Sequence, residues 1–307
     1  MDVYSYRKYN GKFSDKYIYR LGGSFGFFSE YNNMLMCMLY CLLNNKQFIL
    51  QSENANFSSG EGWGEFFEPF CDEYRSDFVK KYNYRTRPYY FSIRDKLLFN
   101  LRKRLLYRQH YMFDFFDDIR KLSCSEIYEI KELGIKGDLL YCASELHKMV
   151  WRYNTVTQKR INSMIDALNL PKHYIGLHIR QGDKITEMKL FSPEDYMKVV
   201  ISNSNCKNVF VLTDDYRVIE KLRTLYSNYS FWTLCLSKEH GYNYEELMQL
   251  SSDERIAANV RLWASMDILE KADIFVGTYS ANPGMNMGFR MSHERIFCLD
   301  FDVWQLW

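Results

Sequence analysis

The feature that most constrains the fold is a regular alternation of strand-like and helical segments after Tyr174. The strand-like segments are rich in β-branched and aromatic residues and are apolar at successive positions, so both of their faces are expected to be buried. Apolar strands that alternate with helices are typical of a parallel sheet covered by helices on both faces. We therefore predict an α/β fold with strands over 175–180, 208–213, 230–235, 273–278 and 295–300.

The helices between these strands carry start signals. Ser192 followed by Pro193 suits an N-cap and a first helical position, and Glu194 and Asp195 are favourable in a first turn. Two further helices are expected over 216–226 and 254–271.

The first part of the chain contains another strand–helix–strand unit. We expect a strand over 16–21, a glycine-rich turn, a helix over 30–43 and a strand over 47–52. An aromatic loop over 57–70 and a basic, mostly helical region to about residue 159 come next. The chain is thus predicted to form two Rossmann-like α/β lobes, 1–165 and 166–307, with a cleft between them.

Charge and cysteine content restrict the class of protein. Lys+Arg 40 against Asp+Glu 38 leaves a net charge of +2, which gives no overall attraction to nucleic acid. The start of the chain lacks an apolar segment, and the longest apolar run, 34–43, is half of the roughly 20 residues that a membrane span needs. The eight cysteines show no CxxC spacing. These features predict a cytoplasmic protein without a signal peptide or transmembrane segment.

Polar side chains come directly after three of the predicted strands. Arg180 ends the first strand, and Asp214 and Asp215 come after the second. The residues after the fourth strand are Tyr279, Ser280 and Asn282. Because ligands of parallel sheets bind beyond the carboxyl ends of the strands, the three groups together predict a binding site.

The chemistry of these residues suits an anionic ligand. Arg180, Lys184 and the start of a helix near Asn282 are suited to a diphosphate. Asp214 and Asp215 could accept hydrogen bonds from a sugar or a base, and Glu187 is a candidate general base. Other interpretations stay open: Arg180 could pair locally with Asp183, the two aspartates could cap the next helix, and Glu187 could be a solvated loop residue.

Several other classes of site have no sequence support. The chain has no GxxxxGK[ST], GxGxxG, HExxH or GxSxG motif. The histidines are dispersed, and no paired carboxylates have metal-ligand spacing. We therefore expect neither a metal nor a cofactor.

With these residues in place, the chain resembles the α1,6-fucosyltransferases, which include the core N-glycan enzyme and the rhizobial Nod-factor enzyme. The segment HIRQGDKITEMKLFSPEDYM, 178–197, is similar to the HVRRTDK segment of the family and to the Glu, Phe, Pro and Tyr-Met positions after it. Further similar segments, in order along the chain, are LGGSFG at 21–26, GWGEFFEPF at 62–70, VLTDD at 211–215, LYSNYSF at 225–231 and KADIFVGTYSAN at 271–282.

The resemblance implies a GT-B-like fold, GDP-β-L-fucose as donor, no metal, and inversion to an α-linked product. Arg180 would hold the donor diphosphate, Glu187 would deprotonate the acceptor hydroxyl, and Lys184 would support the charge, with Asp183 as the next candidate base. The remaining donor-side residues would be His178, Gln181, Asp214, Asp215, Ser265, Asp267, Tyr279, Ser280 and Asn282. The acceptor-side loops would contain Gly22, Gly23, Phe25, Gly26 and Trp63.

The chain departs from the family at several positions. Gln181 stands where the family has a second arginine, and Glu187 matches the family base only with a one-residue gap. The position where the family is expected to have its guanine-reading carboxylate falls near Ser265, and Asp267 comes two residues later. The family histidines after the glycine loop are replaced around Glu30 and Tyr31, and the chain to Trp307 is expected to lack the stem helices and the C-terminal SH3 domain of the animal enzyme. A transferase of the same shape with another nucleotide sugar, and a non-catalytic glycan- or nucleotide-binding module, are the alternatives.

A basic segment suggests a partner surface. Residues 75–108 hold eleven Lys or Arg against two Asp, and 93–112 reads as a basic amphipathic helix. We expect it to contact a membrane peripherally near a lipid-linked or other glycan acceptor. A solvated helix face and nucleic-acid binding are the alternatives, and no RNA-binding motif accompanies the latter. The sequence does not identify the acceptor or the oligomeric state.

Overall fold

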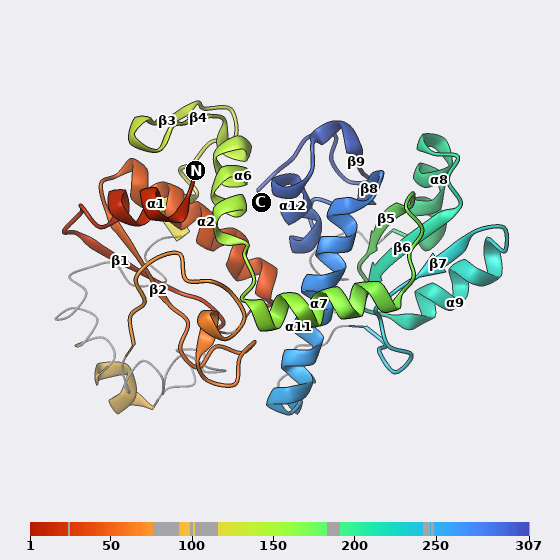
Figure 1. Cartoon of the computed structure of the whole chain (residues 1–307), viewed down its shortest axis with the longest axis horizontal. Helices are drawn as coiled ribbons and strands as arrows, with labels where there is room; N and C mark the ends of the chain where they lie inside the picture. The colour runs from red at the N-terminus through yellow and green to blue at the C-terminus, as the bar shows by residue number, and fades with distance from the viewer. Residues whose placement is uncertain are drawn as a thin grey trace. The chain divides into compact units, whose positions relative to one another are not determined.

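A computed structural model of the protein describes residues 1–23, 25–75, 92–98, 101, 116–182, 191–241, 246 and 249–306. The chain divides into two compact units, 1–154 and 155–307. The division comes earlier than the boundary after residue 165 that the sequence suggests, so α7, Thr155–Ala167, belongs to the second unit. Figure 1 shows the elements of both units, which are described one at a time below.

Unit 2 contains a parallel five-stranded sheet in the order β7-β6-β5-β8-β9. All four pairs of neighbouring strands run parallel, which confirms the predicted parallel α/β fold of this part. The strands are β5 (Ile175–Ile179), β6 (Asn208–Thr213), β7 (Ser230–Trp232), β8 (Ile274–Gly277) and β9 (Ile296–Cys298).

Helices cover both faces of this sheet (Figure 1). The helices α8, Pro193–Asn203, and α9, Tyr216–Leu225, pack on one face, and α11, Ser252–Lys271, packs on β5 and β6 from the other. The helices α7 and α12, Asn282–Arg290, contact α11. A short 3-10 helix, η5 (His293–Arg295), precedes β9. The predicted capping of α8 is confirmed, since Ser192 and Asp195 form a capping box.

The alternation of side chains along β5 decides which residues face which helices. Ile175, Leu177 and Ile179 belong to the core cluster that also contains residues of α8 and α9. Gly176 points to the other face, where a Cβ atom would lie 2.9 Å from the Leu269 side chain of α11. His178, two residues further along, therefore points to the α11 face of the sheet.

Unit 1 begins with a helix and a parallel strand pair. The helix α1, Val3–Asn10, precedes β1, Lys16–Arg20, which pairs in register with β2, Gln47–Gln51. Leu50 of β2 forms a further parallel bridge with Glu73. Between β1 and β2 lies α2, Phe27–Leu43, which starts earlier than predicted because Gly26 takes the extended N-cap conformation.

The predicted helical region up to residue 159 is wrong in part. Within it, β3 and β4 form an antiparallel hairpin around η3, and Gly134 turns the chain with a left-handed φ of 65°. The helical parts of the described region are α5, whose bounds are Phe116–Ile119, α6, the start of α7, and residues 93–98 and 101. The bounds of the remaining elements are η1 (Gly62–Glu65), β3 (Tyr128–Ile130), η3 (Lys131–Leu133), β4 (Ile135–Gly137) and α6 (Leu139–Val150).

An aromatic core holds unit 1 together. Trp63 is fully buried and stacks on Phe67 with ring centroids 4.1 Å apart, while its backbone N–H donates to Ser52. Tyr31 of α2 packs against the same indole. The Tyr31 hydroxyl forms a hydrogen bond of 2.9 Å with Nδ1 of His147 in α6. Among the described helices, none is long and apolar enough to cross a membrane.

Candidate active site

Three polar strand ends of unit 2 lie next to one another. The strand β5 stands between β6 and β8, and all three run in the same direction. The residues beyond their carboxyl ends, Arg180, Asp214 and Ser280, are therefore brought to one edge of the sheet, as the sequence predicts. This edge is where parallel sheets bind ligands.

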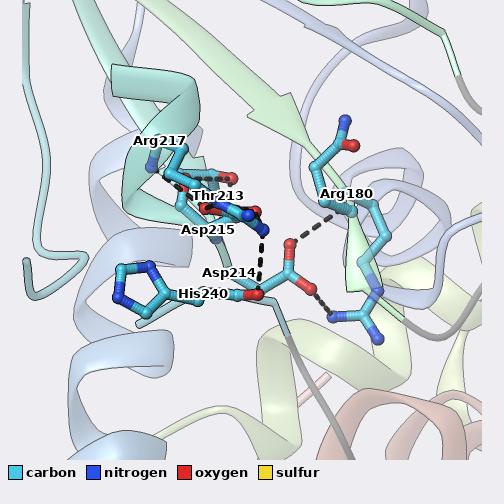
Figure 2. Close-up of polar contacts among 7 residues, drawn as sticks. Arg180, Thr213, Asp214, Asp215, Arg217 and His240 are labelled. Atoms are coloured by element: carbon cyan, nitrogen blue, oxygen red, sulfur yellow. Dashed lines mark hydrogen bonds and ion pairs between the residues drawn. The ribbon is translucent and has the colours of Figure 1, made fainter. Parts of the chain in front are cut away.

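Arg180 and Asp214 form the centre of this edge (Figure 2). The Nη1 atom of Arg180 lies 2.5 Å from Oδ2 of Asp214, and both side chains are only 16% exposed. The backbone N–H of Gln181 donates to the other carboxylate oxygen at 2.8 Å. Asp214, at the end of β6, thus fixes both the Arg180 guanidinium and the main chain just after β5.

Asp215 performs a different task from its neighbour. Its carboxylate caps α9 through the Arg217 N–H and also accepts from Nε and Nη2 of Arg217 (Figure 2). The bond with the Arg217 side chain lowers the pKa of Asp215. The possibility left open by the sequence, that the aspartates cap the next helix, is thus realised by Asp215, whereas Asp214 pairs with Arg180.

His178 is buried beneath this edge. Its Nδ1 atom has no hydrogen-bond partner in the described part of the protein. Burial, and then the nearby charge of Arg180, lower the pKa of His178 to about 4, although Asp214 acts in the opposite sense. The imidazole is therefore neutral at pH 7.

The turn after β8 is held by a residue that the sequence analysis does not identify. The carboxylate of Asp300 accepts the backbone N–H groups of Tyr279 and Ser280, at 2.9 and 2.8 Å, and the Ser280 hydroxyl at 2.5 Å. Tyr279 is buried and its hydroxyl lies 3.4 Å from His293 Nδ1. Asp300 is the last residue of the predicted strand 295–300, which places it at the same edge of the sheet. This position is the sequence signal that could have identified Asp300 as a site residue.

The helix α12 begins directly after this turn. Ala281 is its N-cap and provides no side-chain cap, and Asn282 and Pro283 open the first turn. Gly284 allows the helix to approach the strand end closely, since a Cβ atom there would lie 2.0 Å from the Thr278 carbonyl oxygen. A helix start without a side-chain cap is suited to an anion.

Ser265 and Asp267 have structural partners within unit 2. Ser265 is buried in α11 and its hydroxyl donates to the Arg261 carbonyl at 2.8 Å. Asp267 lies 3.2 Å from Nη1 of Arg290, which also contacts Glu270 at 2.8 Å. These contacts link α11 to the last turn of α12.

In unit 1, the glycine-rich loop is wrapped around a buried carboxylate. Glu30 of α2 accepts the backbone N–H groups of Gly22, Gly23 and Phe25 at 2.5, 3.0 and 3.0 Å. Burial raises the pKa of Glu30, while these N–H groups and the charge of Arg20 counteract the rise. Because the Glu30 carboxylate occupies the amides of Gly22, Gly23 and Phe25, these three amides are not available to a phosphate.

The same loop presents one exposed aromatic ring. Phe25 is 44% exposed, and its carbonyl accepts from the Asn56 side chain. Gly22 has a φ of 78°, and a side chain there would collide with Ala55. Trp63, in contrast, lies entirely in the core, and Gly26 is the N-cap of α2.

Three predicted residues, Asp183, Lys184 and Glu187, lie outside the described residues. Among the residues that the structure does describe, no group of three or more His, Cys, Asp or Glu has the arrangement of a metal site.

A parallel sheet covered by helices, with an arginine and a helix start without a side-chain cap at its carboxyl edge, places the chain among the α/β proteins. The family model for the alpha-(1,6)-fucosyltransferase N- and catalytic domains matches residues 12–282, so the chain belongs to this family. An alpha-(1,6)-fucosyltransferase of Drosophila melanogaster is 23% identical over 226 residues, which are 70% of this chain and 34% of that protein. The chain thus corresponds to about a third of the length of this relative.

Solved structures resemble the chain in fold. The NodZ alpha-1,6-fucosyltransferase soaked with GDP-fucose matches with a TM-score of 0.55 at 12% identity, over 90% of this chain and 92% of that chain. A FUT1 variant of Arabidopsis thaliana in complex with GDP matches with a TM-score of 0.50 at 13% identity, over 96% of this chain and 74% of that chain. The predicted GT-B-like α/β fold is thereby confirmed.

Proposed function

We propose that this chain transfers L-fucose from GDP-β-L-fucose to a hydroxyl group of a glycan, with inversion at the sugar and without a metal. The observation that carries the proposal is Arg180, which Asp214 holds at the carboxyl edge of the sheet beside the strand end that leads into α12. A fixed guanidinium and a helix start can stabilise a departing diphosphate in place of a metal ion. Membership of the family and the GDP-fucose in a solved relative agree with this donor.

The roles of the reacting residues rest on the resemblance. Glu187 would remove the proton from the acceptor hydroxyl on the face of the sugar opposite the leaving GDP, as inversion requires. Lys184 would support the developing charge, and Asp183 is the next candidate base. An α1,6-type linkage is part of the same proposal.

A transferase of the same fold with another nucleotide sugar is the second candidate. Gln181 stands where the family has a second arginine, and its backbone N–H is used by Asp214. Ser265 stands near the expected guanine-reading carboxylate, and its hydroxyl is used within α11. A non-catalytic binding module is the third candidate.

Slow hydrolysis of a panel of nucleotide sugars, measured with and without EDTA, separates the three candidates. Release of GDP from GDP-fucose alone, unaffected by EDTA, supports the proposed donor and the absence of a metal. Preferential hydrolysis of another sugar nucleotide would establish the second candidate, and binding without turnover in the presence of glycan acceptors the third. Glu187→Gln is expected to reduce the transfer rate with little effect on donor affinity.

The described part of the basic segment favours a membrane contact. Ile93, Leu97, Leu98 and Leu101 are spaced for one side of a helix and are between 42% and 79% exposed. Arg94 and Lys96 are exposed beside them, and the sequence continues with Arg102, Lys103 and Arg104. We propose that this surface contacts anionic lipid and brings the enzyme to a lipid-linked glycan on the cytoplasmic face. The part of 93–112 beyond these residues lies outside the described residues.

Liposome co-sedimentation tests this contact. Vesicles with phosphatidylglycerol should bind the protein several-fold better than phosphatidylcholine vesicles, and a Leu97→Ser, Leu101→Ser double variant should lose the difference. Val156→Ser, which alters a somewhat more exposed apolar side chain on α7, is the control. Equal binding to both vesicle types would exclude the proposal.

A further inference from the structure

We propose that Asp300 is a positioning residue for the donor diphosphate, because it fixes the turn between β8 and α12. This inference rests on the proposed function, in that the ligand of this sheet edge is taken to be GDP-linked. It assigns a role to a carboxylate that itself is not suited to contact a phosphate, since the two charges repel each other.

The backbone of Asp300 is placed by the sheet itself. The strands β8 and β9 are parallel neighbours, with Gly277 opposite Cys298. The ladder continues past the strand ends, because the Leu299 N–H donates to the Gly277 carbonyl at 3.0 Å. Asp300 is therefore held opposite the first residues of the turn after β8.

The Asp300 carboxylate binds three donors of that turn. Oδ1 accepts the Tyr279 N–H, and Oδ2 accepts both the Ser280 N–H and the Ser280 hydroxyl. Hydrogen bonds to an ionised acceptor are roughly twice as strong as neutral ones, so the turn has little freedom. The position of Asn282, two residues later at the start of α12, is fixed as a consequence.

This arrangement changes which groups are available to an anion. The amides of Tyr279 and Ser280 point to Asp300 and are already used, and the hydroxyl proton of Ser280 is used as well. A diphosphate at this edge must then be held by Arg180 and by the first turn of α12. The affinity for the diphosphate thus depends on the position and direction of α12. These in turn depend on Asp300.

Isothermal titration with GDP and with guanosine tests the inference. Asp300→Asn keeps the size of the side chain but places an NH2 group against an N–H or O–H donor, so the clamp is broken. We expect the Kd for GDP to rise about tenfold, which is about 1.4 kcal/mol. The Kd for guanosine, which lacks the phosphates, should stay within twofold. Asp302→Asn removes the same charge at an exposed position two residues away and should change neither Kd.

Each outcome decides the matter. An unchanged or lower Kd for GDP in Asp300→Asn would overturn the inference, and so would an equal loss for GDP and guanosine, which indicates a general structural role. If Asp300→Asn does not fold, Asp300→Glu replaces it, because glutamate keeps the charge and shifts it by one methylene. Asp300→Glu should raise the Kd for GDP at least threefold and leave the Kd for guanosine unchanged. An unchanged Kd for GDP would again overturn the inference. If the wild-type protein binds no GDP, the proposed donor fails first, and the two failures are thereby distinguished.

Discussion

Arg180 and Asp214 form a largely buried ion pair between the ends of β5 and β6, with 2.5 Å between Nη1 and Oδ2 and 16% of each side chain exposed. The pair joins two neighbouring strands at the edge where the donor is proposed to bind. Asp214 therefore orients the arginine, and its predicted contact with a sugar or a base stays a prediction. An oriented guanidinium loses less side-chain entropy when it meets a diphosphate than a free one does.

A double-mutant cycle on this pair should show strong coupling. Arg180→Met and Asp214→Leu each leave one charge without its partner in a poorly solvated place, so each should lower the free energy of unfolding by about 3 kcal/mol. The double variant should lose about 1–3 kcal/mol less than the sum, as measured by urea unfolding. The exposed pair Asp195–Lys198 serves as control and should show a coupling below about 0.5 kcal/mol. Additive losses at Arg180 and Asp214 would show that the pair is not formed.

His178 should make the stability of the protein depend on pH. Its pKa is lowered from 6.5 to about 4 in the folded protein, so the unfolded chain binds more protons between these values. The free energy of unfolding should therefore decrease as the pH falls from 6.5 to 4, by roughly 3 kcal/mol from this group. His178→Gln should flatten the profile in this window, whereas the control His173→Gln, at an exposed position, should not. An unchanged profile for His178→Gln would contradict the burial of a neutral imidazole.

Glu30 should be required for the shape of the glycine-rich loop. Glu30→Gln supplies one acceptor oxygen for three N–H groups and turns an NH2 group toward the rest, so a loss of about 1–3 kcal/mol is expected in urea unfolding. The exposed Glu220→Gln should stay within about 0.5 kcal/mol of wild type. If the loop forms part of the acceptor side, Glu30→Gln should also slow transfer while hydrolysis of the donor is retained. Full stability of Glu30→Gln would argue against the three hydrogen bonds.

Gly284 should tolerate no side chain, although alanine normally stabilises a helix. A Cβ atom there collides with the Thr278 carbonyl, so Gly284→Ala should cost about 1–3 kcal/mol and should weaken GDP binding by displacing the start of α12. Gly64→Ala, at a position with open space, is the control and should be neutral or slightly stabilising. Equal thermal midpoints for the two variants would show that α12 can move away from β8 without loss.

The sequence was sufficient for the elements whose signal is local. The apolar strands of unit 2, their parallel direction and the capping box at Ser192 can be derived from patterns within a few residues. The meeting of Arg180, Asp214 and Ser280 at one edge can be derived as well, because parallel strands bring their carboxyl ends together.

The contacts that depend on spatial partners could not be derived from the sequence. Nothing local distinguishes Asp214, which pairs across strands, from Asp215, which caps its own helix. Asp300 is separated by 20 residues from the hydroxyl that it binds. Trp63 lies in a glycine-rich, polar stretch that resembles an exposed loop, yet the indole is buried because Phe67 and Tyr31 pack on it. The hairpin of β3 and β4 was missed because its strands are only three residues long.

Titration of GDP into wild type and Arg180→Ala tests the central claim most directly. If Arg180 holds the diphosphate at the sheet edge, wild type binds GDP, and Arg180→Ala loses at least a hundredfold in affinity, or about 2.7 kcal/mol. Arg160→Ala, which removes an exposed arginine of α7, should bind GDP as wild type does. The same Kd for GDP in wild type and Arg180→Ala, with both proteins folded, would contradict the account.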